Sequence, residues 1–266
     1  MDGTELAHDD VGDGPPLVFL HGITCDRADW SPVAELLAED FRCVNVDLPG
    51  HGGSPRTGAY DVFSQAEAIA SFVAAKGLDR PVVVGHSYGA FIATLIGATA
   101  PVRGVVNVDQ ELDTAAFARR MAPLEQRLRG EDFDGAFRDF VATLGIEHVP
   151  EERRSSVVMR PDKEVVLGVW GTVFDTPPED LVAMVEPTLA AYPVPYLAVY
   201  GATISAEERR LLGLIPQVEV EEWDGLGHFV HIADPARTAA RIRAFAVGAG
   251  ADGTDDPSSP RPSART

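Results

Sequence analysis

The chain alternates short apolar runs with longer stretches of helical periodicity, and no other feature limits its possible folds as strongly. Six runs, bounded by proline and glycine, occupy residues 15–22, 41–54, 81–87, 102–110, 194–202 and 217–225. The first five are continuous β-branched and aromatic stretches, which is typical of strands buried on both faces. Because helical patterns lie between the runs, we predict an α/β fold with a mostly parallel sheet flanked by helices.

Residues 110–193 interrupt this rhythm, because they contain no convincing strand pattern. Helical patterns occur instead at 114–130, 132–145 and 178–192. A connection of this length is too long for an ordinary crossover between strands. We therefore expect a helical lid at 110–193, inserted into an α/β core formed by residues 1–109 and 194–247. Residues 248–266 are rich in Gly, Ser, Pro and Asp and are expected to form a disordered tail.

Composition excludes several classes of partner. The chain has 266 residues and a formal net charge of −19, which repels phosphate backbones and anionic membranes. We therefore expect a small-molecule substrate, no nucleic acid and no membrane, and the composition indicates no particular oligomeric state. Cys25 and Cys43 lie in no CxxC motif or Cys/His cluster, so we expect reduced thiols, no metal and no cofactor. The N-terminus lacks a signal pattern, which favours a soluble cytoplasmic protein.

The pentapeptide GHSYG, residues 85–89, stands where the third apolar run ends and a helical pattern begins. At such an elbow the chain turns sharply, so the residues two before and two after the serine must be small. The turn presents the hydroxyl of Ser87 at the carboxyl edge of the sheet, where α/β sheets bind ligands. The helix that follows offers unpaired N–H groups to a developing oxyanion. Ser87 is therefore predicted to be a nucleophile, and the alternative is a turn without chemistry.

A serine hydroxyl is a poor nucleophile until a base accepts its proton. His228 follows the sixth run in a Gly-rich loop just before the last helical pattern, and we predict that it is this base. His231 is the alternative, although it could equally be a structural histidine at the junction of loop and helix. His21 and His51 also follow strands, and we expect them to bond loop backbone.

Four segments resemble the α/β-hydrolase superfamily, and specifically its lidded esterase- and lipase-like branch: FLHGIT, VDLPGHGGS, VVVGHSYGA and GLGHFVHIADP. They occur in the order and spacing of that family and cover the chain from about residue 16 to residue 247. The resemblance implies Ser87 as nucleophile and His228 as base. It also implies an oxyanion hole formed by the backbone N–H groups of Ile23 and Tyr88. Both positions agree with the sequence, since Tyr88 directly follows the serine and Ile23 follows a His-Gly turn.

The chain departs from the family where the catalytic acid commonly stands. The loop at residues 201–205 carries no carboxylate, and Glu207 and Glu208 beyond it are expected in the exposed first turn of a helix. A histidine base nevertheless needs a partner that fixes its tautomer and stabilises the imidazolium.

Asp109 is predicted to be that partner, because it ends the fourth run at the same sheet edge as Ser87. Some members of the superfamily are similar in carrying the acid after this strand. The alternative role for Asp109 is to cap the first helix of the lid. Glu111 and Asp224 are weaker candidates for the acid.

A serine nucleophile does not match the haloalkane-dehalogenase and epoxide-hydrolase branches of the family, which use an aspartate. No lysine lies beside His228, which counts against the hydroxynitrile-lyase branch. We therefore predict a serine hydrolase that cleaves a carboxylic ester or lactone through an acyl-enzyme. The alternatives are a carbon–carbon bond hydrolase or lyase, a cofactor-free oxygenase or cyclase, and a receptor that only binds its ligand. Fold alone does not distinguish these functions.

Aromatic and methionine side chains of the predicted lid are candidates for an apolar pocket, which would suit an apolar acyl chain or an aromatic ester. These candidates are Phe117, Met121, Phe137, Phe140, Trp170 and Phe174. The alternative is that they pack inside the lid. Arg119 and Arg120 could meet a carboxylate, but a solvated helix face is the expectation we favour.

Overall fold

A computed structural model describes residues 5–251 and contains one seven-stranded sheet in the order β1-β3-β2-β4-β5-β6-β7. Only β1 runs antiparallel to its neighbour, so the predicted mostly parallel sheet is confirmed. Each of the six apolar runs contains a strand. The strands are β1 (His8–Val11), β2 (Pro16–Leu20), β3 (Arg42–Val46), β4 (Val82–His86), β5 (Gly104–Val108), β6 (Tyr196–Tyr200) and β7 (Val218–Glu222). Strand β1 was not predicted, because its sequence HDDV is mostly exposed at the sheet edge and forms no apolar run.

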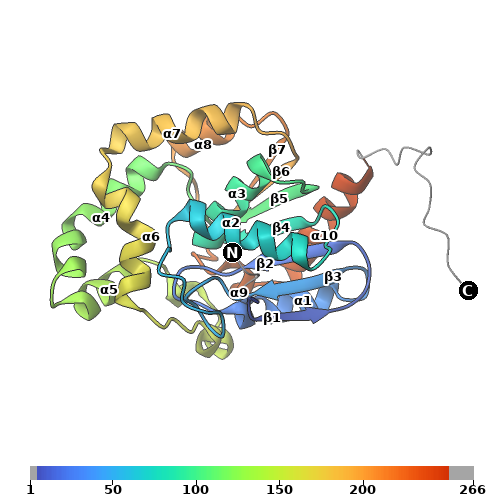
Figure 1. Ribbon diagram of the computed structural model, residues 1–266, viewed down its shortest axis with the longest axis horizontal. Coiled ribbons are helices and arrows are strands. Elements are labelled where there is room, and N and C mark those ends of the chain that lie inside the picture. The colour runs from blue at the N-terminus through green and yellow to red at the C-terminus, as the bar shows by residue number, and fades with distance from the viewer. Residues whose placement is uncertain (1–4, 252–266) are drawn as a thin grey trace, which may run out of the picture.

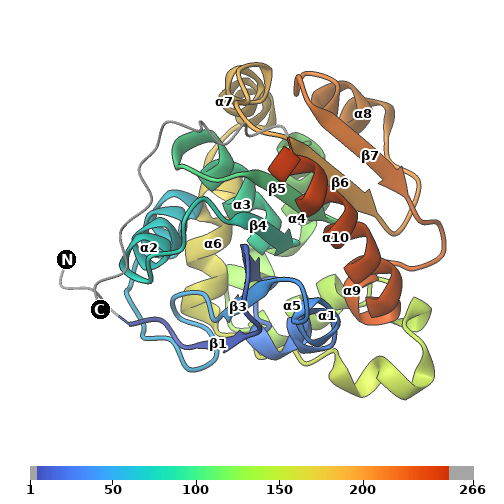
Figure 2. The same cartoon turned by 90° about the vertical axis from the view of Figure 1, so that its right-hand side faces the viewer.

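Helices cover both faces of the sheet, as the alternation of runs predicts. Figure 2 shows α2 (Val62–Ala75) on one side, and α1 (Ser31–Leu37) and α10 (Pro235–Ala251) on the other. Successive side chains of a strand point to opposite faces. In β4, Val83 therefore packs in the cluster with α2 and α3 (Tyr88–Thr99), whereas its neighbours in the strand pack in the cluster with α1 and α10.

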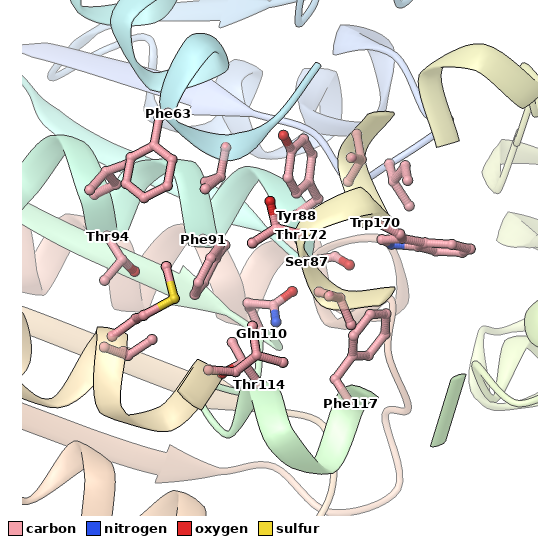
Figure 3. Close-up of a pocket in the computed structure, with 18 of the residues that line it drawn as sticks. Phe63, Ser87, Tyr88, Phe91, Thr94, Gln110, Thr114, Phe117, Trp170 and Thr172 are labelled. Atoms are coloured by element: carbon pink, nitrogen blue, oxygen red, sulfur yellow. The ribbon is translucent and has the colours of Figure 1, made fainter. Parts of the chain in front are cut away.

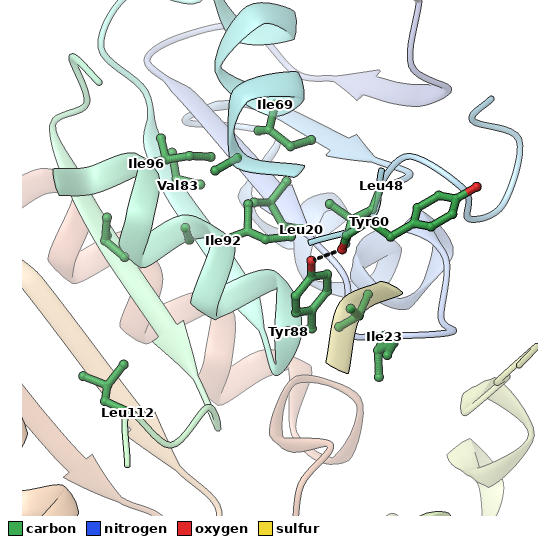
Figure 4. Packing of buried hydrophobic residues seen from close by; sticks show 14 of the residues in the cluster. Leu20, Ile23, Leu48, Tyr60, Ile69, Val83, Tyr88, Ile92, Ile96 and Leu112 are labelled. Carbon is green, nitrogen blue, oxygen red and sulfur yellow. Dashed lines mark hydrogen bonds between the residues drawn. The ribbon is translucent and has the colours of Figure 1, made fainter. Parts of the chain in front are cut away.

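The packing between the sheet and α3 fixes the start of that helix. Leu20 and Val83 of the sheet meet Ile92 and Ile96 of α3 in one buried cluster, which Figure 4 shows. At the first turn of α3, the hydroxyl of Tyr88 donates a hydrogen bond to the carbonyl oxygen of Tyr60 (2.8 Å). The residue that follows Ser87 is therefore held by both apolar packing and a buried hydrogen bond.

Residues 110–193, hereafter the helical segment, form helices that gather at one end of the molecule (Figure 1). They are α4 (Thr114–Arg129), α5 (Phe133–Val141), α6 (Lys163–Asp175) and α7 (Pro178–Ala190), with short 3-10 helices at Ile146–His148 and Glu151–Ser156. Within this fully described segment there is no strand, as expected. Helix α6 was not among the predicted helical patterns.

The remaining helices are the 3-10 helix Arg27–Trp30, α8 (Ala206–Leu212) and α9 (Val230–Ala233). Helix α10 continues to Ala251, so the predicted start of the tail at residue 248 is too early. Residues 252–266 of the predicted tail lie outside the described residues. Of the helices within residues 5–251, none combines the length and apolar character needed to cross a membrane.

Candidate active site

The turn at Ser87 is a strained elbow between β4 and α3. Ser87 has φ 50° and ψ −126°, a left-handed backbone conformation that costs a non-glycine residue about 1–3 kcal/mol. A Cβ on Gly85 would lie 2.3 Å from the carbonyl oxygen of Gly89, and a Cβ on Gly89 would lie 2.4 Å from that of Leu20. Because the blocking atoms belong to the backbone, only glycine fits on either side of the serine.

Asp109 and His228 are brought together although they lie far apart in the sequence. Nδ1–H of His228 donates a hydrogen bond to Oδ2 of Asp109 (2.7 Å), and both side chains are only 18% exposed. The other carboxylate oxygen accepts a hydrogen bond from the backbone N–H of Gly201 (2.7 Å). Since Nδ1 carries the shared proton, Nε2 of His228 is the nitrogen left free to accept one.

The other candidate acids lie elsewhere. Glu111 forms an ion pair with Arg120 (2.8 Å), and Asp224 accepts a hydrogen bond from the hydroxyl of Thr203 (3.1 Å). Glu208 was expected in an exposed helical turn, and this was wrong: it is 2% exposed, and burial raises the pKa of its carboxyl group. Of all the candidate acids, Asp109 is therefore the one that bonds His228.

The other histidines considered from the sequence, His231, His21 and His51, have structural roles. His231 is fully buried, its ring lies 4.3 Å from that of Trp30 and 4.4 Å from that of His86, and burial lowers its pKa to about 3. It is therefore a neutral histidine of the core. His21 and His51 bond the backbone of the loops that follow β2 and β3, as expected.

The loop of His228 is held by its backbone as well as by its ring. Nε2–H of His86 donates to the carbonyl oxygen of His228 (2.9 Å), and the N–H of His228 donates to the carbonyl oxygen of Leu144 in the helical segment (3.2 Å). A Cβ on Gly227 would lie 2.7 Å from the carbonyl oxygen of Gly145. The helical segment therefore contacts the histidine loop directly.

Ser87 and His228 line the same narrow space of about 10 Å³. No hydrogen bond within residues 5–251 joins the serine hydroxyl to the imidazole, and such contacts often tighten only when substrate binds. A Cβ on Gly22 would lie 3.4 Å from the Cβ of Ser87, so the loop after β2 passes beside the serine. Ile23 lines this space, and Tyr88, as the first residue of α3, has an N–H without a partner inside the helix.

A cavity of about 200 Å³ extends from Ser87 between the sheet and the helical segment (Figure 3). Of the predicted pocket residues, Phe117, Phe140 and Trp170 line it. The other three do not, which corrects the prediction: they pack inside the helical segment, where two of them lie against the ring of Trp170. These three residues are Met121, Phe137 and Phe174.

Most of the residues that line the cavity were not predicted from the sequence. Phe91, Thr94 and Leu95 line it from α3, while Phe63 and Met184, which are 55% and 51% exposed, stand at its rim on α2 and α7. The α3 residues follow the serine at helical intervals of three and four, a signal that was available.

The polar part of the lining is small. Gln110, which directly follows the predicted acid, lies close to Ser87 in Figure 3. Among the described residues that line the cavity, none carries a charged side chain. The cavity is therefore suited to neutral, mainly apolar groups.

The fold and the site together define an α/β hydrolase: serine, aspartate and histidine follow β4, β5 and β7 at the carboxyl edge of one sheet. Residues 17–241 match the sequence profile described as the alpha/beta hydrolase family. The chain belongs to that family.

Individual relatives are similar over most of their length. The chain is 29% identical over 253 residues to a pimeloyl-[acyl-carrier protein] methyl ester esterase of Yersinia pseudotuberculosis, covering 86% of this chain and 92% of the relative. It is 28% identical over 247 residues to a 2-succinyl-6-hydroxy-2,4-cyclohexadiene-1-carboxylate synthase of the same species, covering 87% of each. A thermophilic esterase from Thermogutta terrifontis shares the fold, with a TM-score of 0.72, 22% identity, and coverage of 92% of this chain and 93% of the other.

Proposed function

We propose that the chain is a serine hydrolase that cleaves a carboxylic ester or lactone with an apolar acyl or aromatic part. The observation that carries this proposal is the hydrogen bond between His228 and Asp109 beside the strained elbow of Ser87. Relatives named as esterases support ester hydrolysis as the class of reaction.

The reaction follows from these three side chains. The Ser87 hydroxyl attacks the substrate carbonyl while Nε2 of His228 accepts its proton, and Asp109 stabilises the imidazolium. The N–H groups of Ile23 and Tyr88 bind the oxyanion of the tetrahedral intermediate. His228 then protonates the leaving alcohol, and an acyl-enzyme forms. Water repeats the sequence and releases the acid.

The size and the apolar lining of the cavity limit which acyl groups the substrate can carry. The cavity volume of about 200 Å³ and the mainly apolar wall support an acyl part of modest size without charged groups. We propose that the helical segment is the lid over this part, because it supplies Phe117, Phe140 and Trp170 to the cavity wall. The exposed rim at Phe63 and Met184 leaves room for an apolar chain to continue outward.

A non-hydrolytic reaction on the same fold is the second candidate, because a relative of Yersinia pseudotuberculosis is named as a synthase and not as an esterase. That relative is named for a carboxylate product. A carboxylate would meet no cationic side chain among the described lining residues, so the cavity favours the neutral ester.

A fluorophosphonate probe and a series of p-nitrophenyl esters of increasing chain length test the proposal. We expect Ser87→Ala to abolish labelling and ester turnover, and Asp109→Asn to lower kcat by about 10²–10⁴-fold because the imidazole loses its partner. The exposed residues Ser156 and Asp224 supply matched controls, Ser156→Ala and Asp224→Asn, which should retain full activity. Labelling that persists in Ser87→Ala would refute the nucleophile, and full activity of Asp109→Asn would refute the acid.

A further inference from the structure

Asp109, like Ser87, has a positive backbone φ, which is uncommon for a residue other than glycine. In the described part of the chain, four non-glycine residues have a positive φ: Thr24, Arg80, Ser87 and Asp109, with φ 56° for the last. A conformation of this kind persists only where the surrounding structure over-determines it. Something must therefore hold the connection between Asp109 and α4 in place.

The residue after Asp109 is held on two sides. The side chain of Asn107 exchanges two hydrogen bonds with the backbone of Gln110, donating to its carbonyl oxygen (2.8 Å) and accepting from its N–H (3.0 Å). The hydroxyl oxygen of Tyr200 lies 3.1 Å from the same carbonyl oxygen. These contacts fix one end of the connection.

Glu208 holds the other end. Glu208 lies in the first turn of α8 and is buried. Its carboxylate accepts hydrogen bonds from the backbone N–H of Leu112 (2.9 and 2.8 Å to the two oxygens) and of Asp113 (2.8 Å). It also accepts one from the hydroxyl of Tyr200. A buried carboxylate is stable only when its oxygens are bonded, so this geometry is strongly specified.

We propose that Glu208 is a positioning residue, which holds residues 110–113 so that Asp109 keeps the conformation that directs its carboxylate at His228. The inference rests on the proposed function of Asp109 as the acid. Glu208 contacts neither the imidazole nor the cavity, and it acts only through the backbone that it bonds. Because Leu112 and Asp113 directly precede α4, the same carboxylate also anchors the start of the helical segment.

The variant Glu208→Gln keeps the size of the side chain but replaces one acceptor oxygen with an NH₂ group. The N–H of Leu112 donates to both oxygens, so in either orientation of the amide it faces the NH₂ group and loses one of its two acceptors, and the connection can relax. A misplacement of about 1 Å at a reacting group costs about 10²-fold in rate, so we expect kcat to fall by about 10–100-fold. We expect KM to stay within about twofold, because no wall of the cavity changes.

The matched control is Glu207→Gln, which changes the neighbouring carboxylate. The side chain of Glu207 is 42% exposed and pairs with Arg210 at the surface, so this variant should keep the activity of the parent. Thermal unfolding checks that each variant is folded before its kcat is measured.

A double-mutant cycle separates positioning from general stability. If Glu208 acts through Asp109, Glu208→Gln in an Asp109→Asn background should cost less than about twofold more, because the geometry that it preserves no longer matters. The His228 Nδ1–H proton resonance should also exchange faster in Glu208→Gln than in Glu207→Gln.

Several results would overturn the inference. Additive losses in the cycle, full activity of folded Glu208→Gln, or a loss confined to KM would each overturn the positioning role while leaving the proposed function intact. If Asp109→Asn alone keeps full activity, the proposed acid fails and the inference fails with it. If Glu208→Gln does not fold, Tyr200→Phe, which removes one donor, replaces it in the cycle with the same expected lack of additivity.

Discussion

Replacing Gly201 with alanine should displace the histidine loop, although Gly201 has no side chain and is not itself a proposed catalytic residue. Gly201 follows β6, and a Cβ there would lie 1.9 Å from the carbonyl oxygen of Gly227, the residue before His228. It would also lie 2.8 Å from the carbonyl carbon of the same residue. The N–H of Gly201 meanwhile donates to Asp109, so both partners of the hydrogen-bonded pair are affected.

The size of the effect follows from this distance. Ordinary van der Waals contact begins near 3.4 Å, so the histidine loop must move by about 1.5 Å to admit the methyl group of Gly201→Ala. The obstructing atoms belong to the backbone, so no side-chain rotation relieves the clash. A shift of this order at a general base lowers kcat by about 10²-fold or more.

The assay is kcat on a medium-chain p-nitrophenyl ester, with thermal unfolding measured in parallel. The matched control is Gly248→Ala in α10, where an added Cβ meets nothing within 4 Å, and its kcat should equal that of the parent. A folded Gly201→Ala enzyme with the parent's kcat would refute the reasoning, because it would show that the position of His228 does not limit the reaction.

Two further changes probe the cavity and the core. Phe117→Ala should shift the optimum of kcat/KM toward longer acyl chains, and an equal shift in Phe174→Ala, a position outside the cavity, would contradict this. Burial lowers the pKa of His51 and His231 to about 3, so stability should fall as the pH drops from 7.5 to 5.5 because the unfolded chain takes up protons that the folded chain rejects. Each histidine then costs about 1.4 kcal/mol, while Asp29, whose pKa burial raises to about 7, returns about 2 kcal/mol. Burial also lowers the pKa values of His21 and His86, which adds to the loss, so chemical denaturation should give a net loss of more than about 1 kcal/mol, and a gain would contradict the assignment.

The core of the fold was predictable because its signals are local. Val82, Val83 and Val84 form a β-branched run that ends in Gly85, and the pattern alone predicts a buried strand and a turn. The pairing of Asp109 with His228 was predictable for a related reason: parallel strands place the residues after their carboxyl ends along one edge of the sheet.

The surroundings of Glu208 were not predictable from its own segment. The sequence AEERR is typical of an exposed helical turn, and the first carboxylate, Glu207, does pair at the surface. Glu208 is buried because Leu112, 96 residues away in the sequence, and Tyr200, at the end of the preceding strand, bring donors to it. The pocket prediction failed in part for a similar reason. Apolar spacing indicates that Met121 faces the interior, but it does not show whether the side chain packs against a neighbour or lines a cavity.

The hydrogen bond between the N–H of His228 and the carbonyl oxygen of Leu144 limits how freely the helical segment can be exchanged. Chimeras that graft the inserted helices of one homologue onto the scaffold of another treat them as a replaceable module that carries specificity. In this chain the helical segment also supplies a backbone acceptor to His228, the proposed general base. A graft that changes the turn at Leu144 and Gly145 would therefore alter turnover together with substrate choice, and transplanted specificity should be judged on kcat as well as on KM.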